Sequence, residues 1–319
     1  MRLGEIAPGD YARDVLPLTA PLWAGRRSFD EYAAQTIAIA RTPYGRRHYR
    51  TVGLLERGAL LASFKRYERT IREGPRRIRA VGFGAVFTPP ELRGRGYASV
   101  MLAMALDLAR AEGFDVAYLF SDIRPQFYAA LGFRTLPSRK ISLRADSLPS
   151  KRLEVARLGD ADWNGVRHVF ELCDGRRTAS FARTATTWSW IEERVRRASE
   201  HADGHQTNLV VRRRGVYAYV LGMRVPKRDA YVVDEYGYAD DRAAAVLPAL
   251  LRAAAGDLRR IVGWLPPSGA RELLPACSVR KRTRAILMMT PLRPSAEALV
   301  SKLCASAARA DFCWATDHI

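Results

Sequence analysis

Alternating apolar and polar residues in the first half of the chain predict a β-sheet with short connections. Residues 49–55 and 59–67 are both strand-like, and the turn signal around Gly58 between them predicts a hairpin. Residues 78–88 (IRAVGFGAVFT) are rich in β-branched and aromatic side chains, which is typical of a central strand. Two prolines follow, and we expect the strand to end there because proline cannot donate to a sheet.

The pattern changes to a helical period after these prolines. Residues 97–112 carry two adjacent apolar stripes, so this helix has a wide apolar face suited to packing on a sheet. Residues 115–121 return to a short buried strand, a further helix begins at Pro125, and residues 133–143 are again strand-like. With two helical segments expected in residues 7–41, this order predicts a mixed α/β fold with a right-handed crossover.

The second half repeats this order of elements without repeating the sequence. We expect a helix, a strand hairpin, a third strand, a long helix and a short strand, at residues 188–198, 208–213 with 216–225, 230–238, 240–254 and 261–265. The sequence therefore predicts an α/β fold with mixed sheets and two similar domains in tandem. The expected divisions are 1–147, 148–293 and a C-terminal helix and tail at 294–319.

The clearest chemical signal is the loop between the central strand and the next helix, Arg93-Gly94-Arg95-Gly96-Tyr97-Ala98. A loop that wraps a diphosphate must turn several backbone N–H groups inward, and glycines let the phosphates approach closely. The helix beginning at Tyr97 adds unpaired amides and the positive end of its dipole. The spacing differs from the Walker and dinucleotide-binding patterns. A phosphate site of another type is predicted.

This loop resembles the coenzyme-binding motif of the GNAT superfamily of N-acetyltransferases, Gln/Arg-x-x-Gly-x-Gly/Ala, here Arg93-x-x-Gly96-x-Ala98. Downstream, the run YAALGF that begins at Tyr128 resembles the family's second signature, Tyr-x-x-x-Gly-Phe. The resemblance covers residues 1–145. The run VFTPPE before the loop is similar to the fungal lysine N-acetyltransferase group, and two such halves resemble the tandem acetyltransferases of the enhanced-intracellular-survival type.

The resemblance implies acetyl-CoA as co-substrate, while the scattered histidines and the spacing of the cysteines predict no metal site. Strand residues 86–88 would pair with the pantetheine arm, and one of their N–H groups would polarise the thioester carbonyl. The pyrophosphate would lie on the loop amides, and a hydroxyl at Ser121 replaces the family's usual Asn. The expected coenzyme-binding residues are Val86, Phe87, Thr88, Arg93, Gly94, Arg95, Gly96, Tyr97, Ala98, Ser99 and Ser121.

The same resemblance implies two catalytic residues. Tyr128 corresponds to the tyrosine that protonates the departing thiolate; the alternative is a core aromatic residue on a helix. In the tandem relatives the C-terminal carboxylate reaches the first active site, so we expect the tail to return there and Ile319 to be the base. The alternative is a tail that packs on the surface. Glu91 and Asp122 are nearby acids that also fit solvated charges or helix caps.

The second half resembles a second domain of the same type that lacks the coenzyme-binding loop. Its corresponding loop, residues 239–244, has no glycine pair and carries two acids, which would repel phosphates. We expect no coenzyme there, and a role in walling the substrate cleft and supporting the first sheet. Asp234 and Glu235 either face the acceptor amine or, as is more common for acids, lie on the surface.

The net charge of +19 raises a second function class, a catalytically weak GNAT-fold protein that binds nucleic acid or ribosomes. The charge is spread evenly: residues 1–147 carry 24 basic and 14 acidic residues, and residues 148–319 carry 28 and 19. Nucleic-acid binders usually concentrate their charge. Peptidyl transferases that use aminoacyl-tRNA also have paired GNAT folds, but they lack this loop.

The remaining composition narrows the expectation further. No run reaches the roughly 18 apolar residues of a membrane helix, and the first 25 residues lack the apolar run of a signal peptide, so we expect a cytoplasmic location. The four cysteines have no zinc-site spacing. The predicted function is transfer of an acetyl group from acetyl-CoA to a primary amine of a small molecule or amino acid, such as lysine, by direct attack. The sequence indicates neither the acceptor nor the oligomeric state.

Overall fold

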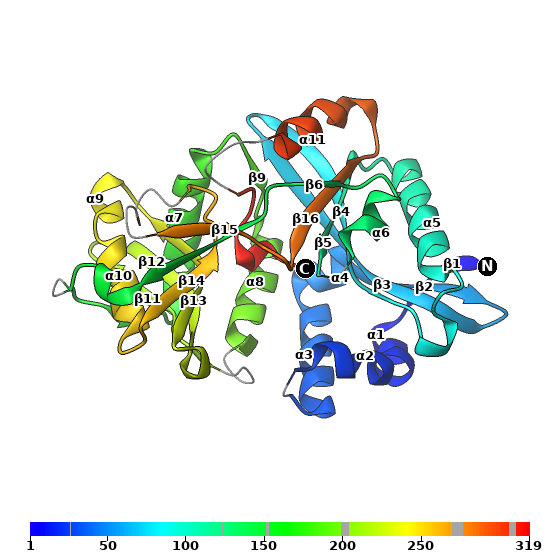
Figure 1. Ribbon diagram of the computed structural model, residues 1–319, viewed down its shortest axis with the longest axis horizontal. Helices are drawn as coiled ribbons and strands as arrows, with labels where there is room; N and C mark the ends of the chain where they lie inside the picture. The colour runs from blue at the N-terminus through cyan, green and yellow to red at the C-terminus, as the bar shows by residue number, and fades with distance from the viewer. Residues whose placement is uncertain are drawn as a thin grey trace.

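The computed structural model describes residues 1–25, 27–122, 124–150, 153–198, 204–269, 273, 277–305 and 311–319. Its strands form two mixed sheets that lie side by side, with the C-terminal tail between them (Figure 1). Each sheet pairs a central strand antiparallel to one neighbour and parallel to the next. The predicted α/β fold with two similar halves is confirmed.

The first sheet has the strand order β1-β2-β3-β4-β5-β16-β6, and β9 pairs with β3. The hairpin and the central strand are confirmed, although both run further than expected, because only a tight turn at residues 74–75 separates them. The strands are β1 (Arg2–Ile6), β2 (Tyr49–Glu56), β3 (Ala59–Glu73), β4 (Arg76–Phe87), β5 (Val116–Ser121), β6 (Arg134–Thr135), β9 (Ala179–Phe181) and β16 (Ile286–Pro291).

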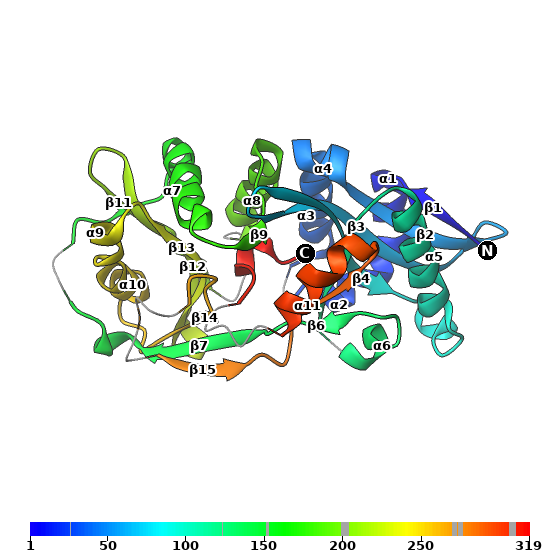
Figure 2. The ribbon, with the colours of Figure 1, turned by 90° about the horizontal axis from the view of Figure 1, so that it is seen from above.

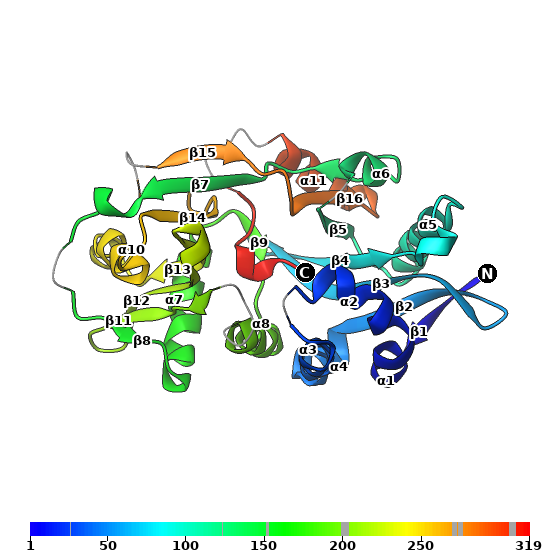
Figure 3. The ribbon, with the colours of Figure 1, turned by 60° about the horizontal axis from the view of Figure 1, so that its bottom comes forward.

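Helices cover both faces of this sheet (Figure 3). The predicted helix after the loop is α5 (Tyr97–Ala111), whose buried stripe packs with Phe64 and Phe83 in one core. A capping box at Ser28 begins α3 (Phe29–Arg41), which leads to α4 (Pro43–His48) on the opposite face. The other helices of this half are α1 (Pro8–Asp10), a π-helical turn (Tyr11–Val15), α2 (Leu16–Trp23), α6 (Pro125–Ala129) and α11 (Glu297–Cys304).

The second sheet has the order β15-β7-β14-β13-β12-β11-β8, and β10 pairs with β12. Its strands are β7 (Arg139–Arg144), β8 (Ala156–Arg157), β10 (His205–Gln206), β11 (Leu209–Arg212), β12 (Val216–Val225), β13 (Ala230–Tyr238), β14 (Arg260–Trp264) and β15 (Ser278–Lys281).

The helices of this half are α7 (Trp163–Gly175), α8 (Ala185–Ala198), α9 (Asp241–Ala244) and α10 (Leu247–Ala255). The single long helix predicted at residues 240–254 is wrong, because it divides into α9 and α10. Pro248 lies in the first turn of α10, where its missing N–H does no harm to a helix.

The two halves exchange strands, which the sequence did not indicate. The strand predicted at residues 133–143 is instead two strands: β6 stays in the first sheet, and β7 crosses to the second (Figure 2). In return, β16 from the second half inserts between β5 and β6. The exchange crosses the division expected after residue 147, because β7 precedes it and β16 follows it.

A shared core also joins the halves. Trp190 of α8 lies against Tyr44 and Tyr67 of the first half, with ring centroids 5.3 Å and 6.0 Å apart. These rings belong to one continuous buried cluster that extends across the second sheet to α10. Separating the halves would expose this aromatic surface to water, so they form one packed unit.

We expect Met289→Ala to reveal the strand exchange in the protein's stability. Met289 is fully buried on β16, opposite Tyr118 of β5 and Arg134 of β6. Its truncation should lower the free energy of unfolding by about 2–5 kcal/mol, measured by urea denaturation. The control Val279→Ala, at an exposed position of β15, should change it by less than about 0.5 kcal/mol. Equal effects of both substitutions would contradict the packing described.

Candidate active site

The centre of the first sheet opens where β4 and β5 diverge. These parallel strands pair from Ala80 with Val116 to Phe83 with Leu119, and no further pair follows although both strands continue. Beyond Phe83, β4 also contains a bulge. Between the pairs Lys65–Gly84 and Ser63–Phe87 the register advances by two residues on β3 but by three on β4, and Ala85 within this stretch has a φ of 47°. The backbone of residues 84–87 therefore has one edge without a partner strand, which an extended ligand could pair with.

The sequence-predicted loop follows directly at the end of β4. Gly94 and Gly96 both have a φ of 79°, and a side chain at either would point into open space. Within the described chain, the backbone N–H groups of residues 94–99 donate no hydrogen bond. Arg93 is held by its Nε, which donates to the Thr88 carbonyl at 3.2 Å. At the start of α5 the loop thus presents backbone N–H groups that donate no hydrogen bond within the protein, as an anion site requires.

Ser121 and Tyr128 lie at the same end of the sheet. Ser121 is the buried last residue of β5, opposite Ile286 of β16. Tyr128 is half-buried on α6, packed against Phe133 at 6.3 Å between ring centroids. Burial, together with the nearby Asp122, raises the pKa of Tyr128 to about 12, so the phenol keeps its proton at neutral pH. The Asp122 carboxylate accepts a hydrogen bond from the Ala285 amide at 2.9 Å, in the bend just before β16.

The C-terminal tail, residues 311–319, is held by buried ion pairs. Asp317 accepts from Arg69 of β3 at 3.0 Å and from Arg183 at 3.2 Å. Arg183 in turn donates to both carboxylate oxygens of Glu235 on β13, at 3.1 Å and 2.8 Å. All four side chains are at most 2% exposed. This buried charge quartet contains equal numbers of positive and negative groups, so the burial of each charge is compensated.

The chain end reaches the open part of the first sheet. A Cβ placed on Gly84 would lie 3.5 Å from the Ile319 carboxyl carbon, and one on Gly82 would lie 2.6 Å from its Cδ1. A side chain at Gly82 would therefore collide with the Ile319 and Tyr118 side chains, whereas at Gly84 the tightest neighbour is Tyr67 at 3.1 Å and Ile319 is at ordinary contact distance. His318 packs between Phe120 and Trp264, at 4.8 Å and 5.7 Å between ring centroids.

Burial, Arg194 and Arg282 lower the pKa of His318 to about 3, so the ring is neutral.

The loop, Tyr128 and Ile319 all lie around the diverging ends of β4 and β5. Sequence reasoning missed the residues that hold the tail, the quartet above all. It also missed Gly82 and Gly84, although glycines alternating within a strand pattern are a signal for close approach of another segment.

The second half has a matching divergence with different chemistry. β13 pairs with β14 only as far as Val233 with Gly263. At the position of the phosphate loop, the Asp240 side chain caps α9 by accepting from the Ala243 amide at 2.7 Å. The anion position is therefore filled by the chain's own carboxylate. The interpretation of Glu235 as a surface charge is wrong, because its carboxylate is fully buried in the quartet.

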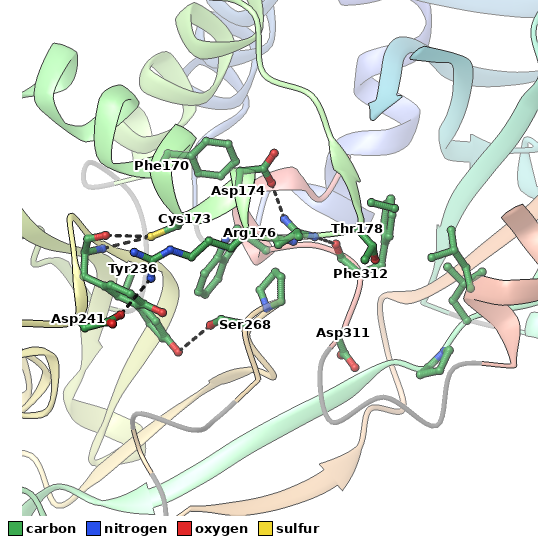
Figure 4. Close-up of a pocket in the computed structure, with 18 residues that line it drawn as sticks. Phe170, Cys173, Asp174, Arg176, Thr178, Tyr236, Asp241, Ser268, Asp311 and Phe312 are labelled. Carbon is green, nitrogen blue, oxygen red and sulfur yellow. Dashed lines mark hydrogen bonds and ion pairs between the residues drawn. The ribbon is translucent and has the colours of Figure 1, made fainter. Parts of the chain in front are cut away.

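A cavity of about 520 Å³ lies beside this second divergence (Figure 4). Tyr236 and Tyr238 of β13 line it together with Cys173 of α7 and Trp314 of the tail. Trp314 packs on Tyr236 with ring centroids 4.8 Å apart. The tail therefore packs against the part of β13 that no longer pairs with β14.

The described residues contain no group of three or more His, Cys, Asp or Glu side chains placed to hold a metal ion. None of their helices combines the length and apolar character needed to cross a membrane.

Comparison with known proteins gives one family match. Residues 25–136 match the model of an acetyltransferase (GNAT) domain. A lysine acetyltransferase of Yarrowia lipolytica is 34% identical over 109 residues, which are 32% of this chain and 28% of that protein. The match thus spans less than a third of the relative's length.

Solved structures match over most of the chain. A protein of Enterococcus faecalis V583, described as a probable N-acyltransferase of unknown function, has a TM-score of 0.71 at 17% identity, covering 91% of this chain and 72% of that one. Eis1 from Mycobacterium abscessus has a TM-score of 0.61 at 15% identity, covering 92% and 74%. At these identities the likeness concerns the fold. Residues 25–136 therefore match an acetyltransferase (GNAT) domain, and the fold of the chain is similar to that of a tandem GNAT protein from the clavulanic acid biosynthesis pathway, with a TM-score of 0.55 at 14% identity, covering 92% of this chain and 99% of that one.

Proposed function

We propose that this protein transfers an acetyl group from acetyl-CoA to a primary amine of a small molecule or amino acid. The observation that carries the proposal is that β4 stops pairing with β5 after Phe83 and leads into a loop whose backbone N–H groups donate no hydrogen bond. A coenzyme A arm needs an unpaired strand edge and its pyrophosphate needs such a loop. The lysine acetyltransferase that matches residues of this chain makes lysine an acceptor to test first.

The coenzyme would bind along residues 86–88 by main-chain hydrogen bonds, with the pyrophosphate on the amides of residues 94–99. Arg93 and Arg95 add positive charge to this loop, and the Ser121 hydroxyl would bond the pantetheine. An N–H group of the bulged strand would stabilise negative charge on the thioester oxygen during attack. The second half would not bind coenzyme, because Asp240 already caps the corresponding helix.

The proton transfers follow from the two groups at the open sheet. The acceptor ammonium would lose a proton to the Ile319 carboxylate, directly or through water. The free amine attacks the thioester carbonyl carbon, the carbon–nitrogen bond forms and the carbon–sulfur bond breaks. The departing thiolate would take the proton of the Tyr128 phenol, and the attacking nitrogen would lose its second proton to solvent, from which Tyr128 regains its own. The products are the acetylamide and coenzyme A.

The alternative is a GNAT-fold protein with weak turnover that binds nucleic acid or ribosomes through its charge of +19. It predicts retention on RNA that falls steeply with salt. The proposed enzyme predicts thiol release with an amine instead.

Gly96→Asp should weaken coenzyme A binding at least about 100-fold in calorimetry, because an anion would lie among the amides and a side chain is strained at this backbone angle. Gly58→Asp is the matched control. Gly58 has a φ of 87° in the β2–β3 turn and is equally open, so it shares the strain without facing the loop. Equal affinity of both variants would remove the loop from the binding site.

Tyr128→Phe should lower kcat about 10²- to 10⁴-fold while coenzyme affinity stays unchanged. Tyr217→Phe, in the second half, serves as the control. The raised pKa, about 12, has a definite sign: the phenol keeps its proton below that pH and loses it only above. Deprotonation of Tyr128 should therefore cause no fall in wild-type kcat between about pH 7 and pH 10. A kcat unaffected by the substitution would leave Tyr128 as a core residue.

Deletion of Ile319 should lower kcat about 100-fold with normal coenzyme affinity, because the carboxylate retreats by one residue from β4. Ile319→Val keeps the terminal carboxylate in place and should retain most turnover. Thiol-release kinetics and calorimetry separate the two effects. Unchanged turnover after the deletion would eliminate the chain end as the base.

A further inference from the structure

A second cavity, of about 340 Å³, lies between the two halves, next to the chain end. We call it the interdomain cavity. Its walls come from α3, α8, β13, β14 and the tail, including Gln35, Ile191, Arg194, Asp234, Trp264 and His318. His318 lines the cavity, and the next residue, Ile319, lies on β4 at Gly84. A small molecule in this cavity would therefore border the proposed acetyl-transfer site.

Asp234 is a carboxylate without a partner in this cavity. In the described chain its side chain makes no hydrogen bond or ion pair, although it is half-buried. Burial raises its pKa to about 7, against the opposing effect of Arg194. It is also the only acid among the described residues that line the cavity. Burying an unpaired carboxylate costs free energy, which a bound cation would offset.

The local strand geometry explains why Asp234 faces the cavity. The pairing of β13 with β12 passes from Glu235 opposite Leu221 to Val233 opposite Gly222, which leaves Asp234 in a bulge. Bulges re-aim side chains. Glu235 enters the buried charge quartet, whereas Asp234, one residue earlier, lines the cavity.

Arg194 supplies the opposite charge from α8. Its guanidinium is fixed by the tail, since Nη1 donates to the His318 carbonyl at 2.7 Å, and it stacks on the Trp190 ring at 4.4 Å. Arg194 and Asp234 affect each other's pKa, yet they form no ion pair within 4.0 Å. Two opposite charges thus line one small cavity without neutralising each other directly.

We propose that Asp234 and Arg194 bind the α-ammonium and the α-carboxylate of an amino acid whose side-chain amine is the acetyl acceptor. This rests on the proposed function and names its substrate class. A simple amine would leave both charges unmatched, a diamine would leave Arg194 unmatched, and an amino carboxylate without an α-amine would leave Asp234 unmatched. Ile191, Val195 and Trp264 give an apolar wall for a methylene chain.

Three acceptors test the assignment: lysine, 1,5-diaminopentane, which lacks the carboxylate, and 6-aminohexanoate, which lacks the α-ammonium. For the wild-type protein, kcat/KM for lysine should exceed that of each analogue about 10- to 100-fold, as expected for loss of one charge-assisted interaction. Asp234→Asn should remove the preference for lysine over 6-aminohexanoate, mainly through KM. Asp107→Asn, an exposed acid on α5, is the control and should keep the preference.

Arg194→Lys should instead reduce the preference for lysine over 1,5-diaminopentane. Arg194 also holds the tail, so the diamine serves as an internal reference. A displaced tail would lower the turnover of lysine and of 1,5-diaminopentane alike, whereas loss of the carboxylate contact would lower that of lysine alone. Asp234→Asn with an unchanged ranking of the three acceptors would overturn the proposal. If the wild-type chain acetylates none of them, the proposed function fails separately. Calorimetry of lysine binding to the wild-type and Asp234→Asn proteins with coenzyme A then decides the assignment, and equal affinities would overturn it.

Discussion

Four buried charges determine how the tail and the two halves of this protein are arranged. Arg69 belongs to the first sheet, Glu235 to the second and Asp317 to the tail, while Arg183 precedes α8 and bridges both acids. Removing one member would leave one excess buried charge among the remaining three, and breaking a buried ion pair in this way typically costs about 3–5 kcal/mol. Although burial by itself would raise the pKa of Asp317, Arg183 and Arg69 lower it. The ion pairs thus persist below the ordinary titration range of aspartate, and the tail stays attached at neutral pH.

The position of the chain end follows from this anchor. Ile319 follows His318, whose ring is enclosed by Phe120 and Trp264 and whose carbonyl accepts a hydrogen bond from Arg194. Because its neighbour is held on both sides, Ile319 has little conformational freedom where it lies on the bulged strand at Gly84. The strand exchange restricts the two sheets as well. Because β16 belongs to the first sheet and β7 to the second, the chain cannot let the sheets rotate freely against each other.

Much of this arrangement was predictable from the sequence where the determinants are local. The loop between β4 and α5 depends on Gly94 and Gly96, and the capped helix α5 on its own apolar stripe, so both were found. The choice of partner for β7 and β16 is not local: each is a short strand with buried positions, and nothing in its residues says which sheet it joins. The same holds for Glu235, whose neighbour Arg183 is 52 residues away in the chain. Acids that are buried with distant partners look identical, in sequence, to acids on the surface. Whether Tyr128 and Ile319 act as acid and base stays a prediction.

The two halves open their sheets in the same way but use the openings differently, and the loop after the central strand decides which use is possible. In the first half the glycines after β4 leave a set of amides that an anionic ligand can reach. In the second half Asp240 satisfies the corresponding helix start, and the part of β13 that no longer pairs with β14 is covered by the tail, with Trp314 on Tyr236 and Thr316 bonded to Glu235. In the second half this opening is therefore covered by the tail of the chain. The same tail continues to the first opening, so the second half fixes one end of it while the other end lies on β4.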